Sequence, residues 1–301
     1  MLTNNKLSKC NGAQSGIYLK LWQCGKIRIQ ENCPLNYFSV ISVAFLNRDF
    51  TLEIYRHLLS TLRKADYSFQ RVEDFIQKPV DRVVVLRHDV DLRNWAAIRL
   101  AKYEASIGIK STYYFRIVQQ SYSPKIIKQI VDLGHEIGYH YEDLANCNGD
   151  FEKAIHSFEM NLAKIRQFYP VKTICMHGSS GTPYDNRDLW KHYKLEDFDL
   201  ICEPYVSIDY NKVLYLSDTG RRWNGFKMSL RDNVKSSYNY NFYSTKDIIK
   251  GIETLPQQIL INAHPEQWTN NLPEWLFVKT FSIAHTLYKI YYRNPKIKQE
   301  L

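Results

Sequence analysis

The sequence has no Cys-x-x-Cys pair and no cysteine and histidine spacing typical of a zinc finger. Its cysteines are few and scattered, at positions 10, 24, 33, 147, 175 and 202. In a chain of 301 residues, six scattered cysteines do not suggest the disulfide framework of a small secreted domain. We therefore expect free thiols, which favours a reducing compartment.

Long apolar runs are also missing. No stretch has the length of apolar sequence that a helix needs to cross a bilayer. The longest apolar-rich run, residues 37–46, lies too far from the first residue for an ordinary signal peptide. These absences predict a soluble, cytoplasmic protein without a transmembrane segment.

The basic residues form no dense block, although Lys and Arg outnumber Asp and Glu by 40 to 31 and the formal charge is +9. Because they are spread along the chain, a solvated basic surface is a better interpretation than nucleic-acid binding. An anionic glycan or a sugar nucleotide would suit this charge as a substrate.

Periodicity separates two regions. Residues 1–47 have little periodicity and contain three of the cysteines, so we predict an N-terminal appendage with little order. From residue 48 to residue 301 the pattern predicts one domain. Its first helix carries apolar residues at helical spacing from Leu52 to Leu62, after a cap at Asp49 or Thr51. An aromatic-rich helix, residues 275–292, is expected to end it.

Between these helices, strand-like runs alternate with amphipathic helices. The runs are 83–90, 112–117, 136–141, 173–177, 200–206, 214–217 and 259–263. Such alternation predicts a mainly parallel sheet with crossover connections. The number of units favours an α/β barrel over an open sheet.

Polar residues collect where these strands end. The segments HDVD, GYHYED, MHGSSG, SDTGRRW and NAHPEQW follow or close the runs. In a β/α barrel the active site is built at the carboxyl ends of the strands. Turn chemistry explains one such ending, but several at one edge indicate a functional site.

Within HDVD, alternation places Asp89 and Asp91 on one face of the strand and His88 on the other. Two adjacent carboxylates repel each other, and a divalent cation would relieve the repulsion. Together with His140, this pair favours zinc or another first-row metal. The alternative is that Asp91 only caps the following helix. His177 precedes a glycine-containing loop that would let backbone approach a ligand.

These motifs resemble the polysaccharide deacetylase family of carbohydrate esterases. The resemblance covers roughly residues 50–268 and is carried by HDVD at 88–91, GHEIGYH at 134–140 and LINAH at 260–264. Members of that family remove acetyl groups from N-acetylated sugars, using water bound to a metal ion, in a distorted (β/α)₇ barrel. The resemblance implies this fold, this activity, and a divalent metal cofactor, with Zn²⁺ expected.

The resemblance also implies roles for individual residues. Asp89 would be the catalytic base, and Asp91 and His140 would bind the metal. His264 would be the general acid, and Asp218 would orient it. The substrate would be an N-acetylated sugar, a sugar nucleotide or a lipid-linked glycan.

The sequence departs from the family at position 144, where Leu144 replaces the usual second histidine ligand. We expect His177 as the third ligand, with Glu142 as second choice. The family's arginine motif is also missing, so Arg87, Arg221 or Arg222 is expected to pair with Asp89.

Four residues are predicted to bind substrate: Glu142, Arg222, Trp223 and Trp268. The two tryptophans could stack on a sugar ring or belong to the core.

Other functions stay open at this point. An Asp-x-Asp pair is also used by metal-dependent glycosyltransferases, which would suit a basic protein but would not explain the histidines at other strand ends. A non-catalytic glycan-binding relative is conceivable because of Leu144. The same site could also hydrolyse another amide or ester.

Overall fold

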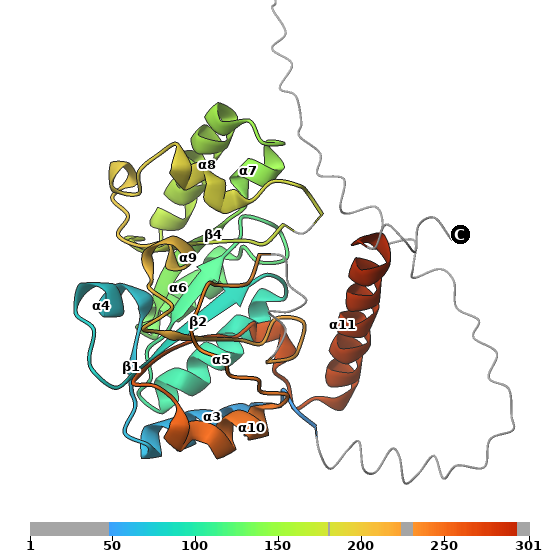
Figure 1. Cartoon of the computed structure of the whole chain (residues 1–301). Coiled ribbons are helices and arrows are strands. Elements are labelled where there is room, and N and C mark those ends of the chain that lie inside the picture. Colours follow the sequence, from blue (N-terminus) through green and yellow to red (C-terminus); the bar gives the residue numbers. More distant parts are fainter. Residues whose placement is uncertain (1–47, 180, 224–230, 294–301) are drawn as a thin grey trace, which may run out of the picture. The chain divides into compact units, whose positions relative to one another are not determined.

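The computed structural model describes residues 48–179, 181–223 and 231–293 (Figure 1). The chain divides into two units, Met1–Asn47 and Arg48–Leu301. The predicted N-terminal appendage lies outside the described residues, and the following paragraphs concern the second unit alone.

The second unit is built on a parallel sheet of seven strands. Its order is β5-β4-β3-β2-β7-β6, and β1 pairs with the first half of β2. In register, Arg87 of β2 lies between Thr112 of β3 and Asn262 of β7. The strands are β1 (Ser68–Gln70), β2 (Val83–Val90), β3 (Thr112–Phe115), β4 (Glu136–Tyr141), β5 (Ile174–Met176), β6 (Leu214–Ser217) and β7 (Gln258–Asn262).

Helices connect and cover the strands, and several begin at side-chain caps. Thr51 caps α3 by accepting from the backbone N–H of Ile54, and Ser244 forms a capping box with Asp247 at α10. The helices are α3 (Leu52–Lys64), α4 (Val72–Gln77), α5 (Asn94–Ser106), α6 (Pro124–Asp132), α7 (Asp143–Asn146), α8 (Phe151–Arg166), α9 (Pro204–Ser207), α10 (Thr245–Gly251) and α11 (Leu272–Arg293), with short 3₁₀ turns η1 (Asn186–Lys191), η2 (Glu196–Phe198), η4 (Ile252–Thr254) and η5 (Pro265–Gln267).

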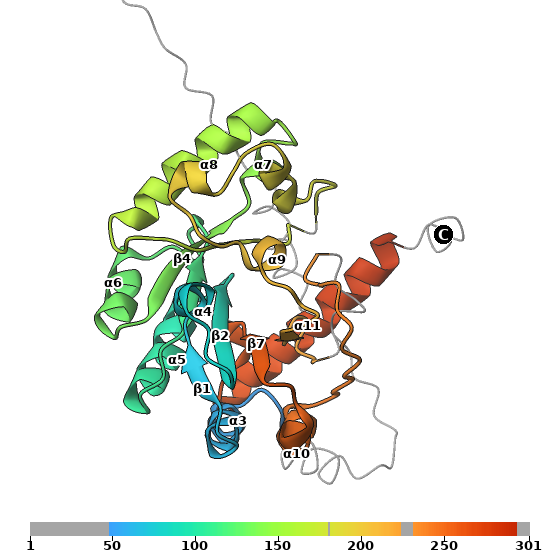
Figure 2. The same ribbon diagram turned by 60° about the vertical axis from the view of Figure 1, so that its left-hand side comes forward.

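Both faces of the sheet are buried, and so is every residue of β2, β3 and β4, as is typical of a parallel sheet covered by helices. On the outer face, Leu86 and Ile261 pack with α3 and α10, which lie side by side in both views (Figures 1 and 2). On the inner face, Val85, Tyr114 and Leu260 form a separate cluster. The predicted distorted (β/α)₇ barrel is confirmed. In the described part of the chain β5 and β6 do not pair, so the barrel is open.

The prediction of one strand is wrong. Residues 200–206 contribute only an isolated bridge, between Cys202 and Thr173, and Pro204 then begins α9. The Glu203 side chain accepts from the backbone N–H of Val206 and caps this helix, which ends the extended segment. The short strand β1, which the sequence pattern did not reveal, is the seventh strand instead.

No helix in the described ranges has the combined length and apolar character that crossing a membrane requires.

Gly138 on β4 provides a test of the packing inside the barrel. A Cβ atom there would collide with the Tyr114 ring and come within 2.7 Å of the backbone oxygen of Thr173. We expect Gly138→Ala to lower the free energy of unfolding by about 1–3 kcal/mol, as overpacking does. The measurement is urea unfolding. The control is Gly251→Ala, whose Cβ would meet Phe242 at an ordinary 3.4 Å, and equal stability of the two variants would contradict the packing described here.

Candidate metal centre and its surroundings

Four side chains meet at the carboxyl ends of the strands, with Asp91 at the centre. Asp91 Oδ1 lies 3.2 Å from His140 Nε2 and 3.8 Å from His177 Nε2, and Asp91 Oδ2 lies 3.9 Å from His264 Nε2. His177 follows β5 and His264 follows β7, which lie on opposite sides of β2 in the sheet order. Only a curled sheet brings such distant strand ends together.

Each of the three histidines is held by its other ring nitrogen. The Nδ1 atoms of His140, His177 and His264 contact the carbonyl oxygen of Cys175 at 2.9 Å, Oε2 of Glu142 at 2.8 Å and Oδ1 of Asp218 at 2.6 Å, respectively. These contacts turn each Nε2 toward Asp91. Metal-binding histidines are characteristically oriented in this way by a carbonyl or carboxylate partner.

The central carboxylate has an unsatisfied atom. Asp91 Oδ1 is buried and accepts no hydrogen bond from the described residues. A buried carboxylate oxygen without a partner is costly, and a cation would remove that cost. Asp91, His140 and His177 therefore fit a divalent ion by chemistry and by orientation.

The protonation states also fit a cation. Burial would raise the pKa of Asp91, but His177, His140 and His264 hold it well below its usual range. Burial lowers the pKa of His177, and the nearby Arg116 lowers it further, against the opposing effects of Asp91 and Glu142. A carboxylate and a neutral imidazole are the forms that bind metals.

A second group of potential ligands lies inside the barrel, where atoms of Asp89, His140 and Cys175 are close enough to share an ion. This group fits less well. Burial raises the pKa of the Cys175 thiol well above its usual value, which disfavours the thiolate that a metal needs. The carboxylate of Asp89 is moreover already engaged by Arg87 and Asn262.

The Arg87–Asp89 pair is buried inside the barrel. Arg87 donates from Nε to Asp89 Oδ1 at 2.9 Å and from Nη2 to Oδ2 at 2.6 Å. Asn262 donates to Oδ2 as well, at 2.9 Å. Burial alone would raise the pKa of Asp89, but Arg87 and His140 lower it well below its usual range. Of the three arginines considered as its partner, the structure brings Arg87 to Asp89, whereas Arg221 donates to the carbonyl of Trp275.

Glu142 lies behind His177, on the side of the ring away from Asp91. Both of its oxygens accept from Arg116, and Oε2 also contacts His177 Nδ1. The structure therefore places Glu142 as a partner of His177 Nδ1, while Nε2 of the same ring faces Asp91. Arg116, which the sequence did not single out, also contacts the carbonyl oxygen of Asp91 at 3.4 Å.

Of the two alternatives for Trp223 and Trp268, a sugar platform or the core, the structure has the core, which corrects their assignment as substrate-binding residues. The side chains are 3% and 0% exposed and pack in the core with Phe50. Trp268 donates from Nε1 to Asp218 Oδ2 at 2.8 Å, so it helps to hold the carboxylate that contacts His264. Arg222 is exposed.

His264 is prepared to carry a proton. Burial disfavours its charged form, but the contact with Asp218, together with Asp91 and Asp89, raises its pKa well above the usual value. Asp218 accepts from the backbone N–H of His264 as well as contacting its ring. Glu266, two residues along, was not predicted. Burial and the charge of Asp91 raise its pKa to about 8, so it is mostly protonated at neutral pH.

A buried network supports the site from the outer face of the sheet. Glu104 contacts His88 Nε2 at 2.9 Å and accepts from Ser111 and Tyr113 at 2.6 and 2.9 Å. His88 Nδ1 contacts the carbonyl oxygen of Ala263 at 3.0 Å. Both ring nitrogens of His88 thus face oxygen acceptors. The network ties the residue before Asp89 to the residue before His264.

No protein family matches the sequence, and no curated protein matches it significantly. Solved structures do match, at low identity. A CE4 family pseudoenzyme from Bacillus anthracis is 15% identical, with a TM-score of 0.38 over 70% of this chain. The match spans 63% of that pseudoenzyme's own length.

Two further structures are similar over a comparable part of the chain. A family 4 carbohydrate esterase from Streptomyces lividans, in complex with acetate, is 16% identical with a TM-score of 0.39, over 69% of this chain and 88% of its own. The peptidoglycan deacetylase PdaC from Bacillus subtilis is 13% identical with a TM-score of 0.33, over 71% and 99%. These are distant likenesses, and the function has to be argued from the site itself.

The buried Glu104 makes the stability of the domain depend on pH. Burial opposes its charge, but His88, His135 and Ser111 lower its pKa to about 2. Because the folded value lies below the unfolded value, the stabilisation is complete above about pH 4.5 and is lost as the pH falls toward 2. We expect Glu104→Gln to remove a contribution of about 3 kcal/mol at neutral pH and much less near pH 2.

The measurement is urea unfolding of both proteins across this pH range. Glu196→Gln is the control, because Glu196 is exposed. A stability difference between wild type and Glu104→Gln that does not change with pH would contradict the ion pair.

Proposed function

We propose that this protein is a metal-dependent hydrolase that removes the acetyl group from an N-acetylated sugar. The observation that supports this most is the convergence of three oriented Nε2 atoms on the half-buried carboxylate of Asp91, whose Oδ1 is buried, with a second carboxylate beside it. Asp91, His140 and His177 would hold the ion, with Zn²⁺ expected from the mixed oxygen and nitrogen donors. A divalent ion at this position supplies a Lewis acid and lowers the pKa of a water molecule.

Asp89 would accept the proton of the attacking water. Its Oδ2 lies 4.0 Å from His140 Nε2, so the carboxylate borders the proposed metal site. Arg87 and Asn262 fix its position and keep it charged. Because Arg87 and His140 lower the pKa of Asp89, this carboxylate is a weak base, and it can act only on a water molecule that has itself been made more acidic.

His264 would donate a proton to the departing amine. Its Nε2 faces Asp91 from the side opposite His177 in the sheet order, and Asp218 keeps the ring oriented and charged. An amine is a poor leaving group unless it is protonated, so a charged imidazole at this position suits amide hydrolysis. The two shifts keep Asp89 ionised and His264 protonated at neutral pH, which are the starting states of a base and an acid.

The substrate class is proposed from the charge of the protein. With a formal charge of +9, the chain favours an N-acetylated sugar with an anionic carrier, such as a sugar nucleotide or a lipid-linked glycan. The glycosyltransferase alternative gains no support. In a glycosyltransferase, Asp89 and Asp91 would both bind the metal ion and the nucleotide. Asp89 instead forms an ion pair with Arg87.

The first test removes the central ligand. We expect Asp91→Asn to lose the bound divalent ion and to lower acetate release from N-acetylated amino sugars by about 100-fold or more, because the ion supplies several kcal/mol of stabilisation. Metal content is measured by mass spectrometry, and acetate by a coupled assay. The control is Asp197→Asn, an exposed aspartate on η2. Full activity in Asp91→Asn would refute the proposed site.

The second test separates the acid from the metal. We expect His264→Ala to keep its metal but to lower kcat for N-acetyl substrates by about 10²–10⁴-fold, the usual contribution of a general acid. An aryl acetate, whose leaving group needs no proton, should be affected far less. His192→Ala, on the exposed C-cap of η1, is the control. Equal losses on amide and aryl ester would argue against the acid role.

A further inference from the structure

The last described helix, α11, exposes one apolar face. The buried side chains of its first turns are Trp275 and Val278. Those of the opposite face remain accessible despite their size: Leu276 is 47% exposed, Phe277 58%, Phe281 40% and Ile283 52%. The smaller Thr280 and Ala284, which share this face by helical spacing, are exposed as well.

The orientation of α11 is fixed by polar contacts on its buried face. Trp275 donates from Nε1 to the carbonyl oxygen of Asp49 at 2.7 Å. Its own carbonyl oxygen accepts from Arg221 at 2.9 Å, and Ser282 donates to the carbonyl oxygen of Gly220 at 3.0 Å. The apolar face therefore cannot turn inward without breaking these bonds.

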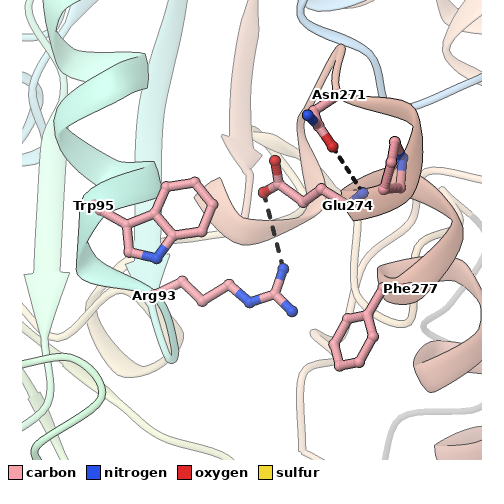
Figure 3. A pocket seen from close by; sticks show the side chains of 6 residues that line it. Arg93, Trp95, Asn271, Glu274 and Phe277 are labelled. Carbon is pink, nitrogen blue, oxygen red and sulfur yellow. Dashed lines mark hydrogen bonds and ion pairs between the residues drawn. The ribbon is translucent and has the colours of Figure 1, made fainter.

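The exposed face continues onto the barrel across a cleft at the start of α5 (Figure 3). Phe277 lines this cleft together with Trp95, which is 46% exposed, and Arg93, whose guanidinium lies 5.0 Å from the Phe277 ring centre. Leu92 is 37% exposed and directly follows Asp91. An exposed apolar side chain therefore stands next in sequence to the candidate metal centre.

We propose that this surface docks on an anionic lipid bilayer. The docking surface consists of Leu92, Trp95, Leu276, Phe277, Phe281 and Ile283. After Glu274, the sequence of α11 contains Lys279, Lys289 and Arg293 and no acidic residue. Aromatic and aliphatic side chains beside basic residues are typical of helices that lie in the membrane interface.

Charge favours a bilayer over a second copy of the chain. Two copies would each bring a formal charge of +9 and repel, whereas an anionic bilayer attracts such a protein. Arg93 lines the cleft, where its Nη1 lies 3.8 Å from Glu274 Oε1, and a lipid phosphate would replace this long contact while the stem of Arg93 stays among apolar groups. If the proposed hydrolase function holds, docking would bring the site to the glycan of a lipid-linked substrate.

The test is flotation of the full chain with vesicles of phosphatidylcholine, with and without about a third phosphatidylglycerol. We expect binding to the anionic vesicles, weakened by salt and by omitting phosphatidylglycerol. The triple variant Leu276→Ser, Phe277→Ser, Ile283→Ser should bind the anionic vesicles more weakly than the wild type, by about tenfold or more. The control is Met160→Ser on α8, whose side chain is 51% exposed. It should bind like the wild type.

Absence of wild-type binding to anionic vesicles would overturn the proposal, and so would unchanged binding of the triple variant. A wild-type dimer that the variant makes monomeric, without vesicle binding, would show an interface between copies instead. Thermal unfolding and acetate release from a water-soluble substrate check that the variant is folded. Vesicle binding does not depend on catalysis, so failure of the hydrolase proposal would be recognised separately.

Discussion

The structure depends on groups that compensate the charges of two carboxylates, Asp89 and Asp91, at the end of β2. Removing a carboxylate from water costs several kcal/mol unless a positive group replaces the solvent. Asp89 is compensated within the chain, by Arg87 two residues earlier on the same strand face. Asp91 is surrounded by three histidines, yet its Oδ1 accepts no hydrogen bond from the described residues. This difference explains why Asp89 can act as a base in the proposed mechanism, whereas Asp91 can bind a cation.

The curl of the sheet and the partners behind each histidine follow from the same constraint. A flat sheet would hold the ends of β5 and β7 apart, so the ring of ligands requires a barrel, even an open one. Leu144 packs in the core and cannot bind a metal. His177 lies near Asp91, and Glu142 and Arg116 hold it there. In the proposed site, His177 can therefore serve as the third ligand without a histidine at position 144.

The sequence predicted the barrel and the convergence of the strand ends. Alternating strands and helices indicate a parallel sheet, and the strands of a parallel sheet all end at the same edge. It could not place side chains that depend on tertiary packing. Trp268 is as compatible with a sugar platform as with a core, and only burial against Phe50 and Asp218 decides. The helix at Pro204 replaced a predicted strand because Glu203 caps it. The partnership of His88 with Glu104 is equally invisible in sequence, since it joins a strand to a helix.

The most direct test of the metal centre is anomalous diffraction from crystals of the full chain grown with Zn²⁺. An ion bound about 2.0–2.2 Å from Asp91, His140 Nε2 and His177 Nε2 is the predicted result. An ion held by Asp89 and Cys175 inside the barrel, or an anomalous map without a peak beside Asp91, would contradict it.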